Sequence, residues 1–435
     1  MKYIKKIKTV DVFETTQTTL DLPNVNLIEE TYEVNYLPYV ETPIETRLIC
    51  KYNIDDIGTV YILNDADNFS SMEVDGIETE VNHEYDFDTI GEHVIKFTLI
   101  DTTTIGNDAF SGISNLVEVI IPDSVTYIGD WTFDECNNIT SVTLGRNVND
   151  IDISGLFICP NISTINISND NNYYSIHDNV LYNKDYTSLI LLYPKTFQGS
   201  FVIPNNITSI NSSAFSSCSG ITSISFSNNL KKIGNAAFSD CTNLTNVTIP
   251  DGVLTIDSSV FSGCSNLLSI TIPNTVTSFG NAIFKECSNL VNVTLPSGIT
   301  SIGEQMFQNC RNLTSITIPN GVTSIHALAF QDCRNLTSIT IPNGVTYIGQ
   351  AAFCRCYKLT SIEIPSSITY IGGTAFQYCD IIESITINAT IPPTIAKTTF
   401  YSTNNCPIYV PAESVDLYKA ASGWSEYASR IQAIQ

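Results

Sequence analysis

The sequence predicts a solenoid of stacked repeats, and three observations lead to that prediction. The stretch CRNLTSITIPNGVT runs from Cys310 to Thr323 and returns unchanged from Cys333 to Thr346, an offset of 23 residues. Cysteines recur at the same 23-residue step, except for one longer interval between Cys159 and Cys218. They are Cys136, Cys159, Cys218, Cys241, Cys264, Cys287, Cys310, Cys333, Cys356 and Cys379. Phenylalanine lies three residues before most of these cysteines, at Phe133, Phe215, Phe238, Phe261, Phe284, Phe307, Phe330, Phe353 and Phe376. A fixed period of this length is typical of units that bury one continuous core by stacking.

The repeat predicts twelve stacked rungs. Phe110 and Phe400 extend the phenylalanine series at its two ends, with Ile113 and Thr403 in the cysteine position, and Leu156 fills the third phenylalanine position. At about 4.8 Å per strand step, these rungs would span about 60 Å.

One rung contains two short apolar segments joined by a turn. Polar and apolar residues alternate over Asn246–Ile249, which predicts a half-buried strand. Pro250 ends this strand because proline cannot donate to a ladder, and Asp251–Gly252 turns the chain. Val253 and Ile256 then form a second short apolar segment. The residues around each phenylalanine predict a helical turn that packs inward.

Composition excludes several classes of function. The chain has 435 residues and a net charge of −24, and residues 11–95 carry 20 Asp or Glu against Arg47 and Lys51. Such acidity disfavours nucleic acid and anionic membrane surfaces as partners. No stretch approaches the roughly 18 apolar residues of a membrane span. The start, MKYIKKIKTV, lacks the apolar core of a secretion signal, so we expect none in this chain.

The repeat resembles the BspA-type leucine-rich repeat family. The pattern C-x-x-L-T-S-I-T-I-P-x-x-V-T-S-I-G-x-x-A-F carries this resemblance over residues 101–400. The insertion NNYYSIHDNVLYNKDYTSLILLYP and the end segment from Cys406 to Ile434 are similar to parts of the same family. The resemblance implies a leucine-rich-repeat solenoid that binds other macromolecules without catalysis, mostly on bacterial surfaces or in protozoan and phage-associated proteins. Bacterial surface members usually begin with a secretion signal, which is a difference from this chain.

The chain divides into four predicted parts. A terminal rung exposes an apolar face, so both ends of the solenoid need a cover. Residues 46–100 alternate as about five strands, and the segment Ser414–Ile434 has the spacing of an amphipathic helix. The parts are an extended attachment arm at 1–45, a small all-β domain and N-terminal cap at 46–100, the solenoid at 101–400 with a hairpin insertion near 168–203, and a helical C-terminal cap at 401–435.

The cysteine series has a functional reading and a structural one. Metal binding is poorly supported, because only Cys354 and Cys356 approach ligand spacing. Disulfide bonds between rungs are unfavourable because the Cα–Cβ vectors run parallel. The structural reading is a small buried side chain that fills the stack. Thirteen cysteines, an odd number, also fit free thiols. We expect no metal and no cofactor.

Other candidate motifs are weak. Asp65–Asn68 begins like a calcium loop, but Phe69 takes a ligand position and Ser70 the glycine position, which favours a solvated acidic loop. The four histidines are scattered, and His326 is expected to face solvent beside a turn. No catalytic residues are predicted.

The exposed side of the first strand is the best candidate binding surface. Its columns are rich in hydroxyls, which suits hydrogen bonding to a glycan or a protein strand; the alternative is a soluble face without a ligand. The candidate residues are Ser269, Thr271, Asn292, Thr294, Ser315, Thr317, Ser338, Thr340, Ser361 and Glu363.

The insertion contains aromatic residues, which are absent from the hydroxyl-rich columns of the first strand. Its sequence predicts a hairpin that turns at Asn183–Thr187 and projects from the third and fourth rungs. Tyrosines on a protruding loop can contact a partner, although more often they bury the hairpin's own face. The candidates are Tyr173, Tyr174, Tyr182 and Tyr186.

These observations favour a non-enzymatic recognition or adhesion protein. Our first hypothesis is a phage virion component that presents the solenoid to a protein or glycan on the host surface, attached through the N-terminal arm. The second is a bacterial cell-surface adhesin. An enzyme acting on glycans is the third, and it would need two converging carboxylates where the sequence offers dispersed ones. The expected location is the virion or the cell surface, without membrane insertion.

Overall fold

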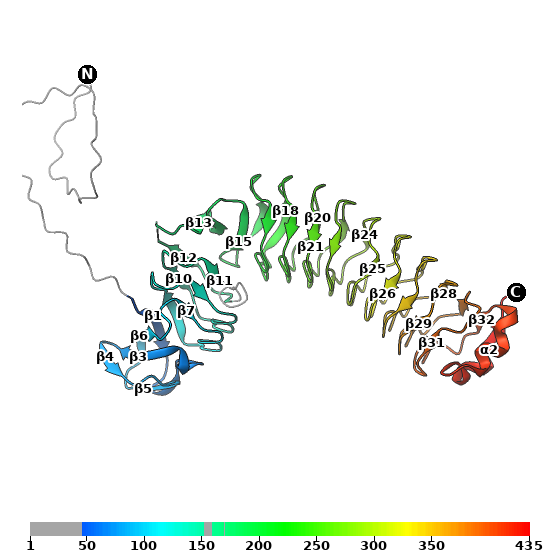
Figure 1. Ribbon diagram of the computed structural model, residues 1–435, viewed down its shortest axis with the longest axis horizontal. Helices are drawn as coiled ribbons and strands as arrows, with labels where there is room; N and C mark the ends of the chain where they lie inside the picture. The colour runs from blue at the N-terminus through cyan, green and yellow to red at the C-terminus, as the bar shows by residue number, and fades with distance from the viewer. Residues whose placement is uncertain (1–45, 152–158, 169) are drawn as a thin grey trace, which may run out of the picture. The chain divides into compact units, whose positions relative to one another are not determined.

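Short strands follow one another at one-repeat intervals (Figure 1) in a computed structural model that describes residues 46–151, 159–168 and 170–435. They build a β-solenoid of about 14 turns with little helix, which confirms the predicted fold class. The predicted arm at 1–45 and Leu156 lie outside the described residues. From Arg47 to Gln435 the chain forms one unit.

The first strand of each repeat forms one row, whose exposed side we name the strand face. Ile270 is buried while Ser269 and Thr271 beside it are exposed, because successive side chains point to opposite sides. Neighbouring strands pair in parallel one repeat apart, so Asn246, Ser269 and Asn292 lie in register. From residue 199 onward the row comprises two hydrogen-bonded sheets. The first contains β16 (Gly199–Val202), β18 (Ile221–Ser225), β20 (Asn246–Thr248), β22 (Ser269–Thr271) and β24 (Asn292–Thr294), and the second contains β28 (Ser361–Ile364), β30 (Ser384–Ile387), β32 (Ile408–Val410) and β33 (Ile431–Ala433).

The second apolar segment of each repeat forms another row of two-residue parallel strands. The inward residue of each is an isoleucine in most rungs. These strands are β7 (Thr104–Ile105), β9 (Tyr127–Ile128), β11 (Asp150–Ile151), β17 (Ser209–Ile210), β19 (Lys232–Ile233), β21 (Thr255–Ile256), β23 (Ser278–Phe279), β25 (Ser301–Ile302), β26 (Ser324–Ile325), β27 (Tyr347–Ile348), β29 (Tyr370–Ile371) and β31 (Thr394–Ile395).

The segment around each phenylalanine forms a turn with left-handed residues rather than a helical turn. In the rung of Phe238 these residues are Ala236 and Asp240, with φ of 52° and 57°. Their N–H groups donate to the carbonyls of Ser258 and Ser262 in the next rung, at 2.9 and 2.7 Å. A helix would direct these donors along its own axis. The bonds between rungs therefore offset the steric cost of the left-handed conformation, about 1–2 kcal/mol per residue.

The phenylalanine rings stack along the core. From Phe215 to Phe400 each ring lies nearly parallel to the next, with centroids 4.9–6.1 Å apart and interplanar angles of 3–19°. Phe110 and Phe133 stack at 5.5 Å in the first rungs. All these rings are buried. Such pairs contribute about 0.5–1.5 kcal/mol beyond the area that they bury.

Nine cysteines of the series each join two rungs by a hydrogen bond. Cys241 Sγ donates to the carbonyl of Phe215, 26 residues earlier, at 3.1 Å. The same bond recurs at 2.9–3.4 Å for Cys136, Cys159, Cys264, Cys287, Cys310, Cys333, Cys356 and Cys379. The cysteine position thus holds a small side chain that is also a weak donor, which adds to its predicted role as a filler.

All thirteen cysteines are free and buried, in agreement with the expected free thiols. Burial raises the pKa of every thiol, for example to about 12 for Cys136 and Cys159. The thiols are therefore protonated at neutral pH, and a protonated, buried thiol is a poor nucleophile.

Residues 46–100 form six strands, where about five were predicted: β1 (Leu48–Ile54), β2 (Gly58–Tyr61), β3 (Phe69–Val74), β4 (Ile77–Thr79), β5 (Glu84–Phe87) and β6 (Gly91–Leu99). β1 pairs antiparallel with β6 on one side and with β8 (Leu116–Ile120) of the first rung on the other. A single sheet, β12-β10-β8-β1-β6-β3-β4, therefore continues from the solenoid strands β10 (Ser141–Leu144) and β12 (Thr164–Ile167) into this part. Its antiparallel strands cover the backbone edge of the first rung.

The C-terminal segment is not the single helix that the spacing predicted. It contains η2 (Ala412–Ser414), α2 (Val415–Ala420) and η3 (Trp424–Arg430), and the break lies at Gly423, whose φ is +81°. The Trp424 ring lies 5.6 Å from Phe400 and its Nε1 donates to the carbonyl of Pro393 at 2.8 Å. Trp424 thus covers the last ring of the phenylalanine stack.

The insertion forms the hairpin that was predicted to turn at Asn183–Thr187, but this hairpin is part of the stack and does not project from it. β13 (Tyr174–His177), β14 (Val180–Asn183) and β15 (Ser188–Leu192) pair antiparallel, and β15 then pairs in parallel with β17. β16 and β33 likewise extend the row of first strands without a repeat phenylalanine of their own. Turns of this kind explain why the solenoid has about 14 turns where the phenylalanine series predicted twelve.

We expect Phe307→Ala to destabilise the protein by about 3–5 kcal/mol, because the ring is fully buried between Phe284 and Phe330. Urea unfolding, with hydrogen exchange to localise the effect, measures this change. Tyr401→Ala is the matched control, since Tyr401 is 57% exposed and its loss should cost about 0.5 kcal/mol or less. Equal costs for the two variants would contradict a core built on stacked rings.

We expect the folded protein to resist thiol labelling and to lose stability in alkali. A free cysteine titrates near pH 8.5, and the folded thiols titrate higher, so the unfolded chain releases protons first as pH rises. Stability is therefore full below about pH 8.5 and falls above it. Labelling with a chromogenic disulfide reagent should be slow in the native state and should reach all thirteen thiols in concentrated guanidinium. Fast native labelling of most thiols would refute the buried series.

Candidate functional site

The strand face brings the predicted hydroxyl columns together. All ten candidate residues on it are exposed, and the register places Ser269 beside Asn292 and Thr271 beside Thr294. An isolated bridge between Thr317 and Thr340 continues the row towards β28. The surface offers rows of donors and acceptors one rung apart, which can hydrogen-bond an extended glycan or peptide.

Glu363 is the one carboxylate among the predicted residues of the strand face. Its Oε1 accepts a hydrogen bond from Asn388 Nδ2 at 2.7 Å, which fixes the side chain along the row. Hydrolysis of a glycosidic bond normally uses two carboxyl groups facing each other across the bond. The predicted residues therefore supply contacts but not an acid–base pair.

The structure separates the four candidate tyrosines of the insertion. Tyr174 and Tyr182 are buried, which corrects their predicted role as contact residues, and burial raises the pKa of both phenols. Tyr186 is partly buried against Tyr182, with ring centroids 4.3 Å apart. Tyr173 is 44% exposed and stays available to a partner. The insertion thus uses its aromatic rings mainly to fill its own core.

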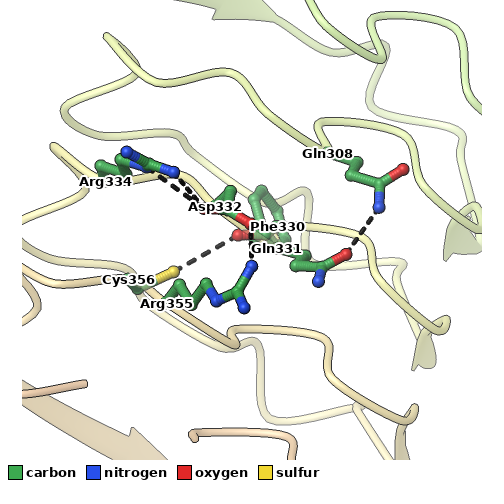
Figure 2. Close-up of polar contacts among 7 residues, drawn as sticks. All are labelled: Gln308, Phe330, Gln331, Asp332, Arg334, Arg355 and Cys356. Carbon is green, nitrogen blue, oxygen red and sulfur yellow. Dashed lines mark hydrogen bonds and ion pairs between the residues drawn. The ribbon is translucent and has the colours of Figure 1, made fainter. Parts of the chain in front are cut away.

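A basic and aromatic surface lies on the turns beside the cysteine series, and the sequence analysis missed it. Asp332 is buried, and two arginines converge on its carboxylate (Figure 2). Arg334 donates to Oδ1 through Nε and Nη2, at 3.1 and 3.0 Å, and Arg355 of the next rung donates to Oδ2 through Nη1 at 3.3 Å. We name the surface the arginine–tyrosine ridge and define it by Arg311, Arg334, Arg355, Tyr357, Lys358 and Tyr378.

Each guanidinium group also lies over a tyrosine ring one rung further on. Arg334 is 5.7 Å from the ring centre of Tyr357, and Arg355 is 6.0 Å from that of Tyr378. Cation–π contacts of this kind contribute about 0.5–1 kcal/mol at exposed sites. The hydrogen bond to Asp332 raises the pKa of Arg355 further above its ordinary range. Both guanidinium groups are therefore held in place, and both remain 45% exposed.

The second row of strands carries another aromatic pair. Tyr347 and Tyr370 stack with centroids 5.1 Å apart, and His326 lies 5.9 Å from Tyr347. His326 is exposed, as predicted. Because the two rings face each other, they present mainly their edges to solvent.

Lys195 is buried within the insertion. Its Nζ has no hydrogen-bond partner within the described part of the chain. Burial lowers the pKa of Lys195. A buried amine without a hydrogen-bond partner lowers the stability of the fold, so we interpret Lys195 as a destabilising residue and not as a binding residue.

Among the residues that the structure describes, no group of three or more His, Cys, Asp or Glu is arranged to hold a metal ion. No described helix combines the length and the apolar character needed to cross a membrane.

Comparison with known proteins identifies the repeat. A family model described as "BspA type Leucine rich repeat region (6 copies)" matches residues 85–199, 192–314 and 277–407. Among solved structures, a leucine-rich repeat protein from Eubacterium ventriosum is 22% identical with a TM-score of 0.46, over 63% of this chain and 80% of that one. The leucine-rich repeat protein of T. pallidum is 27% identical with a TM-score of 0.38, over 44% and 90% of the two chains. A leucine-rich cell surface protein from Faecalibacterium prausnitzii is 22% identical with a TM-score of 0.35, over 67% and 84%. No curated protein matches the sequence.

We expect Lys195→Met to stabilise the protein by about 1–3 kcal/mol near neutral pH, because it removes a buried polar group without a partner. The gain should shrink as pH rises towards about 10.4, where lysine becomes neutral in the unfolded chain too. Urea midpoints at neutral and alkaline pH measure both effects. Lys358→Met, at an exposed lysine, serves as the control and should change little. A loss of stability in Lys195→Met would contradict the unpartnered state of the amine.

Proposed function

Because the chain belongs to the BspA-type leucine-rich repeat family, we propose that it is a non-enzymatic recognition protein whose strand face binds a protein or glycan on a cell surface. The observation that carries this proposal is the continuous run of exposed hydroxyl and amide side chains over β22 and β24. The run is held in register by backbone bonds, so a ligand meets side chains at a fixed spacing of one rung.

We place this function first in a phage virion, where the solenoid would be presented to the host surface and residues 1–45 would attach to the virion. The resemblance to a family with both phage-associated and bacterial surface members supports either of two locations. The second candidate is therefore a bacterial cell-surface adhesin. Glu363 alone among the predicted strand-face residues is acidic, which favours recognition over glycan hydrolysis.

We expect the triple variant Thr271→Lys, Thr294→Lys and Thr317→Lys to weaken binding to host cells by about tenfold or more, about 1.4 kcal/mol, because three cations would obstruct the hydroxyl columns. The matched control carries the same change in the same rungs at Thr277, Thr300 and Thr323, which are exposed beside the second row of strands. Flow cytometry with labelled full-length protein measures binding. Equal weakening by both variants would overturn the assignment to the strand face.

A second measurement tests the location. Mass spectrometry of gradient-purified virions and of washed cell-wall fractions should find the chain in virions if the first setting is correct. Recovery only from cell walls would support the adhesin and reject the virion.

A further inference from the structure

We propose that the arginine–tyrosine ridge is a binding site for an acidic polysaccharide, separate from the strand face. The ridge is basic on an acidic protein. Between residues 301 and 400 the sequence has five Lys or Arg, namely Arg311, Arg334, Arg355, Lys358 and Lys397, and the first four of them lie on the ridge. On a chain of net charge −24, four basic residues over three successive rungs form a local positive surface that favours binding of an anion.

The buried carboxylate of Asp332 holds the arginines of the ridge in place, but it does not neutralise all of their positive charge. Asp332 supplies one negative charge and is 7% exposed, whereas Arg334 and Arg355 supply two positive charges and are each 45% exposed. Asp380 follows Tyr357 by one repeat and limits the basic surface at that end. One guanidinium charge, with those of Arg311 and Lys358, therefore remains to meet a ligand.

The two guanidinium groups keep donors for that ligand. Arg334 uses Nε and Nη2 for Asp332, which leaves Nη1, and Arg355 uses Nη1, which leaves Nε and Nη2. The Nε and Nη2 groups of Arg355 form a planar fork, which can bind a carboxylate or a sulfate through two parallel hydrogen bonds. Since Asp332 and the tyrosines already fix both groups, binding would cost little side-chain entropy.

The surroundings of the ridge fit sugar rings. Tyr378 is 37% exposed and Tyr357 partly so, and they offer apolar ring surface beside the charges. An asparagine ladder runs next to the arginine column, with Asn312 Nδ2 donating to Asn289 Oδ1 at 3.1 Å and Asn335 Nδ2 to Asn312 Oδ1 at 3.3 Å. The rungs repeat at about 4.8 Å, close to the length that one pyranose adds to an extended chain.

Other anionic polymers fit less well. Double-stranded nucleic acid carries one negative charge per about 1.7 Å of its axis, which is denser than one carboxylate per sugar unit, so it would meet stronger repulsion from the rest of this acidic chain. An acidic peptide is normally bound at a free sheet edge or in an apolar groove. On the ridge the backbone is already bonded between rungs, as in Asp332 N–H to the carbonyl of Cys354 at 2.9 Å and Arg355 N–H to that of Gln377 at 2.7 Å. A polysaccharide needs only the side chains.

The test measures binding of full-length protein to polygalacturonate, a carboxylated polysaccharide, with neutral dextran for comparison. Affinity electrophoresis and titration calorimetry at low salt give the dissociation constant. Arg334→Gln with Arg355→Gln should weaken binding by about a hundredfold, about tenfold for each lost charge-assisted pair. The control Lys231→Gln with Lys397→Gln removes the same net charge from exposed lysines elsewhere and should leave binding within about twofold.

A second variant guards against misfolding, because the first one leaves Asp332 buried without its arginines. Arg311→Gln with Lys358→Gln changes only exposed ridge residues and should weaken binding about tenfold while melting remains unchanged. Arg334→Lys with Arg355→Lys keeps the charge and should not restore full affinity, since lysine lacks the planar fork.

The outcomes separate this proposal from the function of the strand face. Strand-face variants should bind polygalacturonate normally, so either assignment can fail alone. Equal weakening by the lysine control would show a diffuse charge effect and overturn the site. Absence of saturable binding, or equal binding of dextran, would also overturn it. Full competition by poly-glutamate at lower concentration would assign the ridge to an acidic protein and reject the polysaccharide.

Discussion

The structure depends on backbone hydrogen bonds between equivalent positions of successive rungs. In the turn rows the N–H of Phe238 donates to the carbonyl of Val260, and that of Phe261 to the carbonyl of Ile283, so each donor meets an acceptor 22 residues later. In the strand rows the partner lies one full repeat away. Satisfying nearly every backbone group in this way requires each rung to copy the path of its neighbour. The period of the sequence is the consequence of that requirement.

In the core, the side chain at each inward position packs against the side chains at the same position in the two neighbouring rungs. A phenylalanine stacks on a phenylalanine, and a cysteine thiol reaches the carbonyl of the phenylalanine in the preceding rung. Alanine in the cysteine position would fit but would lose this donor. Cysteine, which is a reactive residue in many proteins, is therefore repeated here as an unreactive part of the core.

The sequence predicted what the repeat itself encodes: the solenoid, the inward columns and the exposed columns of the strand face. It failed where the repeat is interrupted. Tyr174 and Tyr182 lie in an insertion whose register with the neighbouring rungs cannot be read from the period, so it was not predictable that these two tyrosines are buried while Tyr173 is exposed. The C-terminal helix was overextended because its apolar spacing continues through Gly423, where the backbone turns left-handed. The ridge was missed for another reason. Arg355 and Asp332 are one repeat apart, so the period does place them together, but the period alone does not distinguish Arg and Tyr beside the cysteines from the small polar residues at these positions in other rungs.

The identical copies at Cys310–Thr323 and Cys333–Thr346 have a consequence for how such a chain can change in length. Each rung contacts mainly its two neighbours, and both ends are closed by separate covers, β1 at one end and Trp424 at the other. Unequal recombination between the duplicated coding segments would remove or add one complete rung without altering either cover or the bonding between the rungs that remain. The ridge lies across these copies, so a single such event would also alter the number of arginines in it. Length and charge of the binding surface can thus vary together between strains, in steps of one repeat, while the fold is kept.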